Sequence, residues 1–387
     1  MTDPDLSLTQ GQLRARSGMK WTRYPPDVLP AWVADMDFPV AAPIRAAIGR
    51  MLDAQDLGYA RHDAAQRVAG AYADWMRARH GWDADPANVL VCDDVVQMLH
   101  ACVLAFAGEG EGVIVQTPIY PPFLSAVTQN KRRLLENRLM QGANRWEMDL
   151  DGLVRDIDRN TRLLMLCNPH NPTGRVFTKA ELEKLSGIAV EHDLIVVADE
   201  IHMDLAYAPN KHIPLASLGA DIAARTITLT SASKAFNIAG LHCAVTHFGS
   251  AGLRERFGRI QPRLLGGPSS LAISATEAAW CEGGPWLDAV LAQLNANRSK
   301  VADFINAALP GVHHFTPEAT YLAWLDCTDL NLPVPASKFF LDKAGVALSP
   351  GGDFSSFTNS FARLNFATSP EILDEILSRM ASAVNNR

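Results

Sequence analysis

Residues 162–174, RLLMLCNPHNPTG, join a run of apolar residues directly to a turn rich in asparagine, proline and glycine. A short apolar run that ends at such turn signals is typical of a strand buried on both faces of a sheet. Similar runs precede and follow it, at residues 113–115 (VIV), 194–198 (LIVVA) and 225–230 (RTITLT). Strands of this kind are expected in a parallel sheet covered by helices on both sides. The sequence therefore predicts an α/β fold.

The chain divides by pattern into three parts. Helical patterns at residues 95–107 and 179–192 alternate with the apolar runs in the middle of the chain. The C-terminal part differs, with a long helical pattern at 269–308, strand patterns at 321–325 and 362–366, and a last helix from residue 370. We predict a large domain over residues 50–268 with a mostly parallel sheet, a smaller α+β domain over 269–387, and an N-terminal arm, 1–49, that contributes to the smaller domain.

Composition excludes several classes of protein. The 387 residues are 48% hydrophobic and 20% charged, with a formal net charge of −7, so no basic surface for nucleic acid is expected. No apolar run reaches the length of a membrane span. The N-terminal MTDPDLSLTQ is polar and unlike a signal peptide, and the six cysteines form no CxxC pair. We expect a cytoplasmic protein with free thiols, no metal site and no membrane partner.

Functional side chains come directly after the predicted strands. In an open parallel sheet, ligands bind outside the carboxyl ends of the strands, so these side chains should meet at one edge. They comprise an amide, a carboxylate, an imidazole, two hydroxyls, an amine and a phenol. The residues are Asn171, Asp199, His202, Ser231, Ser233, Lys234 and Tyr120.

Two simpler interpretations are excluded because the motifs that they require are absent. The run IVVADE could belong to a P-loop ATPase, but that class needs a Gly-Lys dipeptide and the chain has none. Ser231-x-x-Lys234 matches the serine motif of penicillin-recognising enzymes, but their SDN and KTG motifs are absent. The combined set suits pyridoxal phosphate. An amine condenses with its aldehyde, a carboxylate pairs with its ring nitrogen, a phenol stacks on the ring, and hydroxyls and main-chain N–H groups hold its phosphate.

Several motifs make the resemblance specific. NPHNPTG, ADEIH, SASK followed by Ala-Gly-Leu, and Arg-Leu-Asn at 363–365 resemble the class I/II aminotransferase superfamily of fold type I over nearly the whole chain. WVADMDF at residues 32–38, TPIYPPF at 117–123 and SKAFNIAGL at 233–241 are similar to its MalY/PatB branch, the cystathionine β-lyase-like C–S lyases. Of these, the N-terminal WVADMDF is the best discriminator, because ordinary aminotransferases do not usually carry it.

The resemblance implies roles for individual residues. Lys234 would form the Schiff base and carry the proton, Asp199 would face the pyridine nitrogen, and Tyr120 would stack on the ring. Arg363 would clamp the substrate α-carboxylate bidentately, and Asn171 would contact the ring oxygen and the substrate. The remaining cofactor contacts would come from His202 beside Asn171, from Ser231, Ser233 and the N–H groups of Val95 and Val96 at the phosphate, and from Tyr59 of a neighbouring subunit. A homodimer with shared active sites follows from the last role.

The sequence departs from the expected pattern in two places. Asp93 and Asp94 stand before the two valines, where the branch usually has a glycine. Their charge suits a helix N-terminus but opposes a bound phosphate. His242 stands where many aminotransferases carry an arginine for the phosphate.

The resemblance implies a C–S β-lyase that splits L-cystathionine or cysteine S-conjugates into a thiol, pyruvate and ammonia. Core residues alone do not separate elimination from transamination, because both begin with the same proton abstraction. An aminotransferase is therefore one alternative. A regulator that binds another protein on the same fold is a second.

Overall fold

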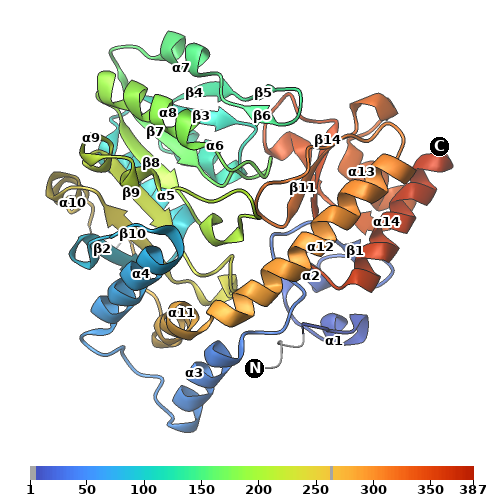
Figure 1. The fold of residues 1–387 in the computed structure, drawn as a ribbon, viewed down its shortest axis with the longest axis horizontal. Helices are drawn as coiled ribbons and strands as arrows, with labels where there is room; N and C mark the ends of the chain where they lie inside the picture. Colours follow the sequence, from blue (N-terminus) through green and yellow to red (C-terminus); the bar gives the residue numbers. More distant parts are fainter. Residues whose placement is uncertain (1–5, 262–264) are drawn as a thin grey trace.

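The computed structural model describes residues 6–261 and 265–387, so the first five residues of the polar N-terminus lie outside it. Its centre is a seven-stranded sheet in the order β2-β10-β9-β8-β7-β3-β4 (Figure 1). Only β10 runs against its two neighbours, so the sheet is mostly parallel, as predicted. In chain order the strands are β2 (Val89–Cys92), β3 (Gly112–Thr117), β4 (Arg133–Arg138), β7 (Thr161–Cys167), β8 (Ile195–Asp199), β9 (Thr226–Thr230) and β10 (Ala244–Phe248).

Helices cover both faces of this sheet. Side chains of a strand alternate between faces, so Val113 and Val115 of β3 pack in one core while Ile114 packs in another. The first core includes α5 (Val95–Phe106), α6 (Pro121–Thr128) and α10 (Ala251–Phe257). The second lies under α7 (Leu150–Asp156), α8 (Lys179–Glu191) and α9 (Ala220–Ala223). Burial on both faces explains why these strands are continuous apolar runs.

A smaller sheet lies beside the large one (Figure 1). It has the order β11-β14-β13, with β11 (Leu322–Asp326), β14 (Phe361–Asn365) and β13 (Ser349–Pro350) antiparallel. The N-terminal arm joins this part, because β1 (Leu29–Pro30) pairs with β12 (Val346–Ala347). The helices of this part are α1 (Gln10–Arg14), α2 (Met19–Thr22), α12 (Gly284–Ala308), α13 (Ala336–Ala344) and α14 (Pro370–Asn385).

The long helical pattern at 269–308 is not one helix. It forms α11 (Ser270–Glu282) and α12, which begins at Gly284. Pro285 lies in the first turn of α12. A proline there has no N–H to continue the preceding helix and its ring would clash with the carbonyl four residues earlier. The apolar faces of α11, α3 (Ala42–Asp53) and α4 (Ala64–His80) contribute to a core that continues into the C-terminal part.

The structure also bears on two exclusions made from composition. Within residues 6–261 and 265–387, no helix combines the length and hydrophobicity that a membrane crossing requires. All six cysteines are free thiols, and five are buried, whereas Cys281 is exposed. No group of three or more potential metal ligands occurs in the described part of the chain.

Candidate active site

A cavity of about 440 Å³ opens at the carboxyl ends of the central strands. The register of the sheet places Cys167, the last residue of β7, beside Asp199, the last residue of β8. Because β10 is antiparallel to both β9 and β2, β2 runs in the same direction as β9 and also ends at this edge, where α5 begins. Ten of the eleven predicted site residues line the cavity: Val95, Val96, Tyr120, Asn171, Asp199, His202, Ser231, Ser233, Lys234 and Arg363. The eleventh, Tyr59, lies outside it and is fully exposed on the loop between α3 and α4.

Lys234 lies on the cavity wall, and no carboxylate of the described residues forms an ion pair with it. Its Nζ donates a hydrogen bond of 3.1 Å to the carbonyl oxygen of Ala34, which is 200 residues away in the sequence. Burial lowers the pKa of Lys234, and the positive charge of Arg363 adds to this effect, while Asp35 and Asp199 oppose it. The amine is thus held where its neutral form is more accessible than in water.

Asp199 and His202 supply a carboxylate and a neutral imidazole. Asp199 is 4% exposed, and its Oδ1 accepts a 3.0 Å hydrogen bond from the N–H of Ile201. Burial raises the pKa of Asp199 to about 7, so a cation placed against it would strongly favour the ionised form. Burial lowers the pKa of His202 to about 3, and its Nδ1 is buried without a partner among the described residues. His202 therefore offers an uncharged ring to a ligand.

Arg363 is held by three neighbours. Its Nη1 donates to Oδ1 of Asn171 at 2.9 Å, and its Nη2 donates to Oγ of Ser349 at 3.0 Å and to the carbonyl oxygen of Trp32 at 3.2 Å. Burial lowers the pKa of Arg363 to about 10, which still leaves a cation at neutral pH. Its Nε is buried and has no partner in the described part of the chain. An unpaired guanidinium donor in a cavity fits a carboxylate ligand.

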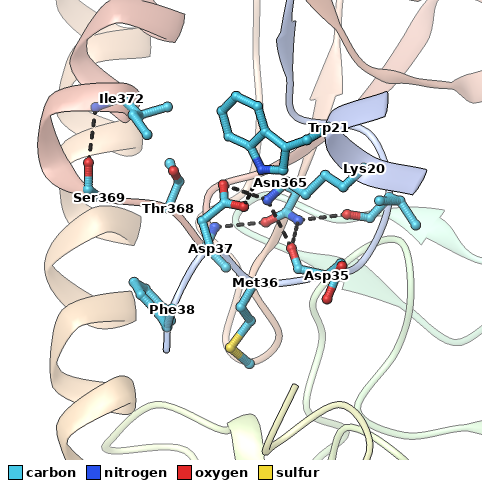
Figure 2. Close-up of polar contacts among 12 residues, drawn as sticks. Lys20, Trp21, Asp35, Met36, Asp37, Phe38, Asn365, Thr368, Ser369 and Ile372 are labelled. Atoms are coloured by element: carbon cyan, nitrogen blue, oxygen red, sulfur yellow. Dashed lines mark hydrogen bonds and ion pairs between the residues drawn. The ribbon is translucent and has the colours of Figure 1, made fainter. Parts of the chain in front are cut away.

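The tryptophan segment, residues 32–38, forms one wall of the cavity through Val33 and Ala34. Figure 2 shows how the rest of it is fixed. Lys20 Nζ lies 2.8 Å from Oδ2 of Asp37 in a buried ion pair, and Trp21 Nε1 donates to Asp37 Oδ1 at 2.7 Å. Asn365 Nδ2 donates to the carbonyl oxygens of Val33 and Asp35, both at 2.7 Å.

Sequence reasoning found the tryptophan segment only as a motif, without its contacts. The carbonyl oxygens of Ala34 and Trp32 accept hydrogen bonds from Lys234 and Arg363 respectively. No pattern of side chains in the sequence could predict these two contacts. Ser349 was also missed, because it lies in a two-residue strand, β13, that is too short to show a periodic pattern.

The start of α5 provides main-chain donors. Val95 and Val96 line the cavity, and in the first turn of a helix the N–H groups have no intrahelical acceptor. Asp94 caps this helix, since its Oδ1 accepts from the N–H of Gln97 at 2.7 Å. Its Oδ2 lies 3.7 Å from Nδ1 of His242, so the two departures from the family pattern are neighbours. Ser231 donates to the carbonyl oxygen of Cys243 at 2.6 Å.

Comparison with known proteins identifies the family of this chain. The family described as aminotransferase class I and II matches residues 35–380. The chain belongs to this family. Among its relatives, cystathionine beta-lyase PatB of Bacillus subtilis is 37% identical over 93% of each chain. Protein MalY of Escherichia coli is 33% identical over 92% of each.

Solved structures agree with this membership. OvoB is 38% identical with a TM-score of 0.94, and cystalysin from Treponema denticola, which contains pyridoxal 5'-phosphate, is 30% identical with a TM-score of 0.93; each comparison covers 100% of both chains. The predicted fold type, the cystathionine β-lyase-like branch and the dependence on pyridoxal phosphate are thereby confirmed.

The residues of this class I and II aminotransferase fold fit that cofactor. The cavity combines an accessible amine, a buried carboxylate and a phenol with two nitrogens, Nε of Arg363 and Nδ1 of His202, that have no partner among the described residues. Free N–H groups at the start of α5 suit a phosphate. The carboxylates of Asp93 and Asp94, which line the cavity at the same helix end, carry charges that oppose it.

Proposed function

We propose that this protein is a C–S β-lyase that splits L-cystathionine or cysteine S-conjugates into a thiol, pyruvate and ammonia. The observation that carries the proposal is the meeting of Lys234, Asp199 and Arg363 in one cavity. Support comes from relatives that are named cystathionine beta-lyases or putative cystathionine beta-lyases. They are 33–37% identical to this chain and align with more than nine-tenths of it.

Bound pyridoxal phosphate supplies an aldehyde that condenses with the substrate amine and a ring that draws electron density from Cα. Arg363 binds the α-carboxylate and so orients the substrate. Lys234, as a neutral amine, takes the Cα proton. The Cβ–S bond then breaks, sulfur leaves with the electron pair, and a proton makes it a thiol. The electron pair of the broken Cα–H bond forms a double bond between Cα and Cβ. The three-carbon fragment, which keeps the amino nitrogen, then takes up water and ends as pyruvate and ammonia.

Asp199 and Tyr120 act on the ring in this scheme. Asp199 would keep the ring nitrogen protonated through an ion pair, and Tyr120 would lie against the ring face. Asn171 would donate to the ring oxygen through its amide nitrogen, since its Oδ1 already accepts from Arg363. Ser231, Ser233, Val95 and Val96 would hold the phosphate.

We further propose a homodimer that works in the cytoplasm. The exposed loop between α3 and α4 carries Tyr59 together with Leu57, and Leu52 at the end of α3 is also exposed. Apolar side chains gathered on a protruding segment are suited to burial against another subunit. Tyr59 would then reach the phosphate of the neighbouring subunit.

A single assay tests the reaction. L-cystathionine is added to the purified protein with pyridoxal phosphate and no keto acid, and pyruvate and free thiol are followed together. Sustained release of equal amounts supports a β-lyase, and the variant Lys234→Ala should release neither. One conversion of the bound cofactor to its amine form, without thiol, would instead identify an aminotransferase awaiting its acceptor.

A further inference from the structure

The tryptophan segment holds two aspartates in different ways. Asp37 is paired on both oxygens, with Lys20 and with Trp21, and is 2% exposed. Asp35 uses its main-chain oxygen for Lys20, at 3.0 Å, and for Asn365 (Figure 2). In the part of the chain that the structure describes, its carboxylate makes no hydrogen bond or ion pair. Asp35 therefore has a charge that the segment itself does not neutralise.

This free carboxylate follows the residue that Lys234 contacts. The carbonyl oxygen of Ala34 accepts from Nζ of Lys234 and from the hydroxyl of Tyr321, each at 3.1 Å. Burial raises the pKa of Tyr321, and the charge of Asp35 is the next largest cause of that rise. Burial lowers the pKa of Lys234, and Asp35 is the largest charge opposing that fall. Asp35 thus acts on both donors that meet at Ala34.

The other charged groups around Lys234 do not stabilise its ammonium form once a cofactor is bound. Arg363 disfavours a second cation in the cavity, and Asp199 would be engaged with the ring nitrogen of a bound cofactor. The ion pair with Asp37 already neutralises Lys20. The titratable and charged groups that act on Lys234 or on Asp35 are Arg363, Asp199, His202, Tyr321, Lys20, Asp37 and Arg16.

We propose that Asp35 is a positioning residue for Lys234. The negative charge of Asp35 holds the ammonium form of Lys234 at Ala34 while Lys234 carries the substrate's Cα proton. The proposal rests on the proposed function, in which Lys234 takes that proton and the departing sulfur needs one. Without a nearby negative charge, a buried ammonium beside Arg363 would be costly. Asp35 offsets this cost without contacting the amine, so the lysine can still move to the substrate.

Competitive labelling of the cofactor-free full-length chain tests the charge effect directly. Limiting acetic anhydride reacts only with neutral amines, and mass spectrometry of the Lys234 peptide across pH gives the fraction of neutral lysine. Loss of a nearby opposite charge lowers the pKa of an amine, so Asp35→Asn should make Lys234 about tenfold more reactive at neutral pH. Asp35→Glu should restore much of the wild-type curve.

Asp93→Asn is the matched control. It removes an acid from the same cavity, but Asp93 is not among the charges that act on Lys234. Its labelling curve should follow that of the wild type. If Asp35→Asn fails to fold, as judged by circular dichroism, Asp35→Ser tests the same loss of charge. A curve for the charge-free variant that overlies the wild type would overturn the proposal.

Kinetics of the holoenzyme separate positioning from mere structural support. Asp35→Asn should lower kcat severalfold and shift its pH profile, while KM, which depends on Arg363, stays within about twofold. Unchanged kcat despite altered labelling would overturn the role in proton transfer. The labelling experiment uses neither substrate nor turnover, so its result does not depend on the lyase assay. A failure of the proposed role of Asp35 can therefore be told apart from a failure of the proposed lyase activity.

Discussion

Replacing Arg363 with alanine tests the substrate clamp most directly. The side chain is 5% exposed, and its Nε has no partner while its two Nη atoms are held by Asn171, Ser349 and Trp32. A hydrogen bond to a charged group contributes about 1.5–3 kcal/mol, so a bidentate pair with a carboxylate contributes about 3–5 kcal/mol. We expect Arg363→Ala to lower kcat/KM for L-cystathionine by about 10²- to 10⁴-fold, mainly through KM.

The same change also removes three internal hydrogen bonds, so stability must be measured alongside. Arg298→Ala is a suitable control, because Arg298 also donates to a carbonyl oxygen, that of Pro317 at 2.9 Å, and lies over the ring of Tyr207. Thermal unfolding of both variants shows how much general loss each suffers, and only Arg363→Ala should raise KM. Arg363→Lys keeps the charge but not the two-pronged geometry, and it should fall between wild type and alanine.

A substrate analogue without the α-carboxylate completes the cycle. The decarboxylated amine should inhibit the wild type more weakly than a matched amino acid does, by about the factor lost in Arg363→Ala. In Arg363→Ala the two inhibitors should bind alike, because the group that recognises the carboxylate is gone. The reasoning is refuted if KM stays unchanged in Arg363→Ala, or if this variant still prefers the inhibitor that carries the carboxylate.

Four further predictions concern the cofactor end of the cavity. Lys234→Ala should abolish turnover and the visible absorbance of the bound cofactor; persistence of that absorbance would assign it to another amine. Asp94→Gly should tighten cofactor binding severalfold in equilibrium dialysis, because it removes a carboxylate near the phosphate at a cost of only a few tenths of a kcal/mol in helix capping; an unchanged affinity would show that the acid does not oppose the phosphate. In the cofactor-free protein the pKa of Asp199 is about 7, above its usual 3.8, so Asp199 favours the fold below about pH 4 and this contribution is lost as the pH rises through about 7. Asp199→Asn should flatten that part of the curve of unfolding free energy against pH, and a curve of wild-type shape would contradict it. Tyr59→Ala should weaken cofactor binding while sedimentation still reports a dimer; undiminished affinity would place the tyrosine outside the shared site.

Much of the large sheet can be predicted because its strands are buried on both faces. Such strands appear as unbroken apolar runs, and residues that follow them fall at one edge of a parallel sheet whatever the loops do. This is why Asn171, Asp199, Ser231 and Lys234 could be brought together before any coordinates. The break between α11 and α12 was harder, because the apolar period continues across Gly283 and only Pro285 marks the new start.

The smaller part of the protein was predicted less completely. Its strands β1, β12 and β13 are two residues long, too short to show a period. Ser349 therefore had no visible link to Arg363 before the antiparallel pairing of β13 with β14 set the two opposite each other.

By itself the sequence determines which chemical groups the chain carries after each strand, because amines, carboxylates and guanidinium groups are fixed by residue type. Only the tertiary structure decides what those groups contact. Lys234 is 200 residues from the carbonyl oxygen of Ala34, and Arg363 is 331 residues from that of Trp32. Every residue has a carbonyl oxygen, so no sequence pattern can mark the two that matter; packing of the arm against both sheets selects them.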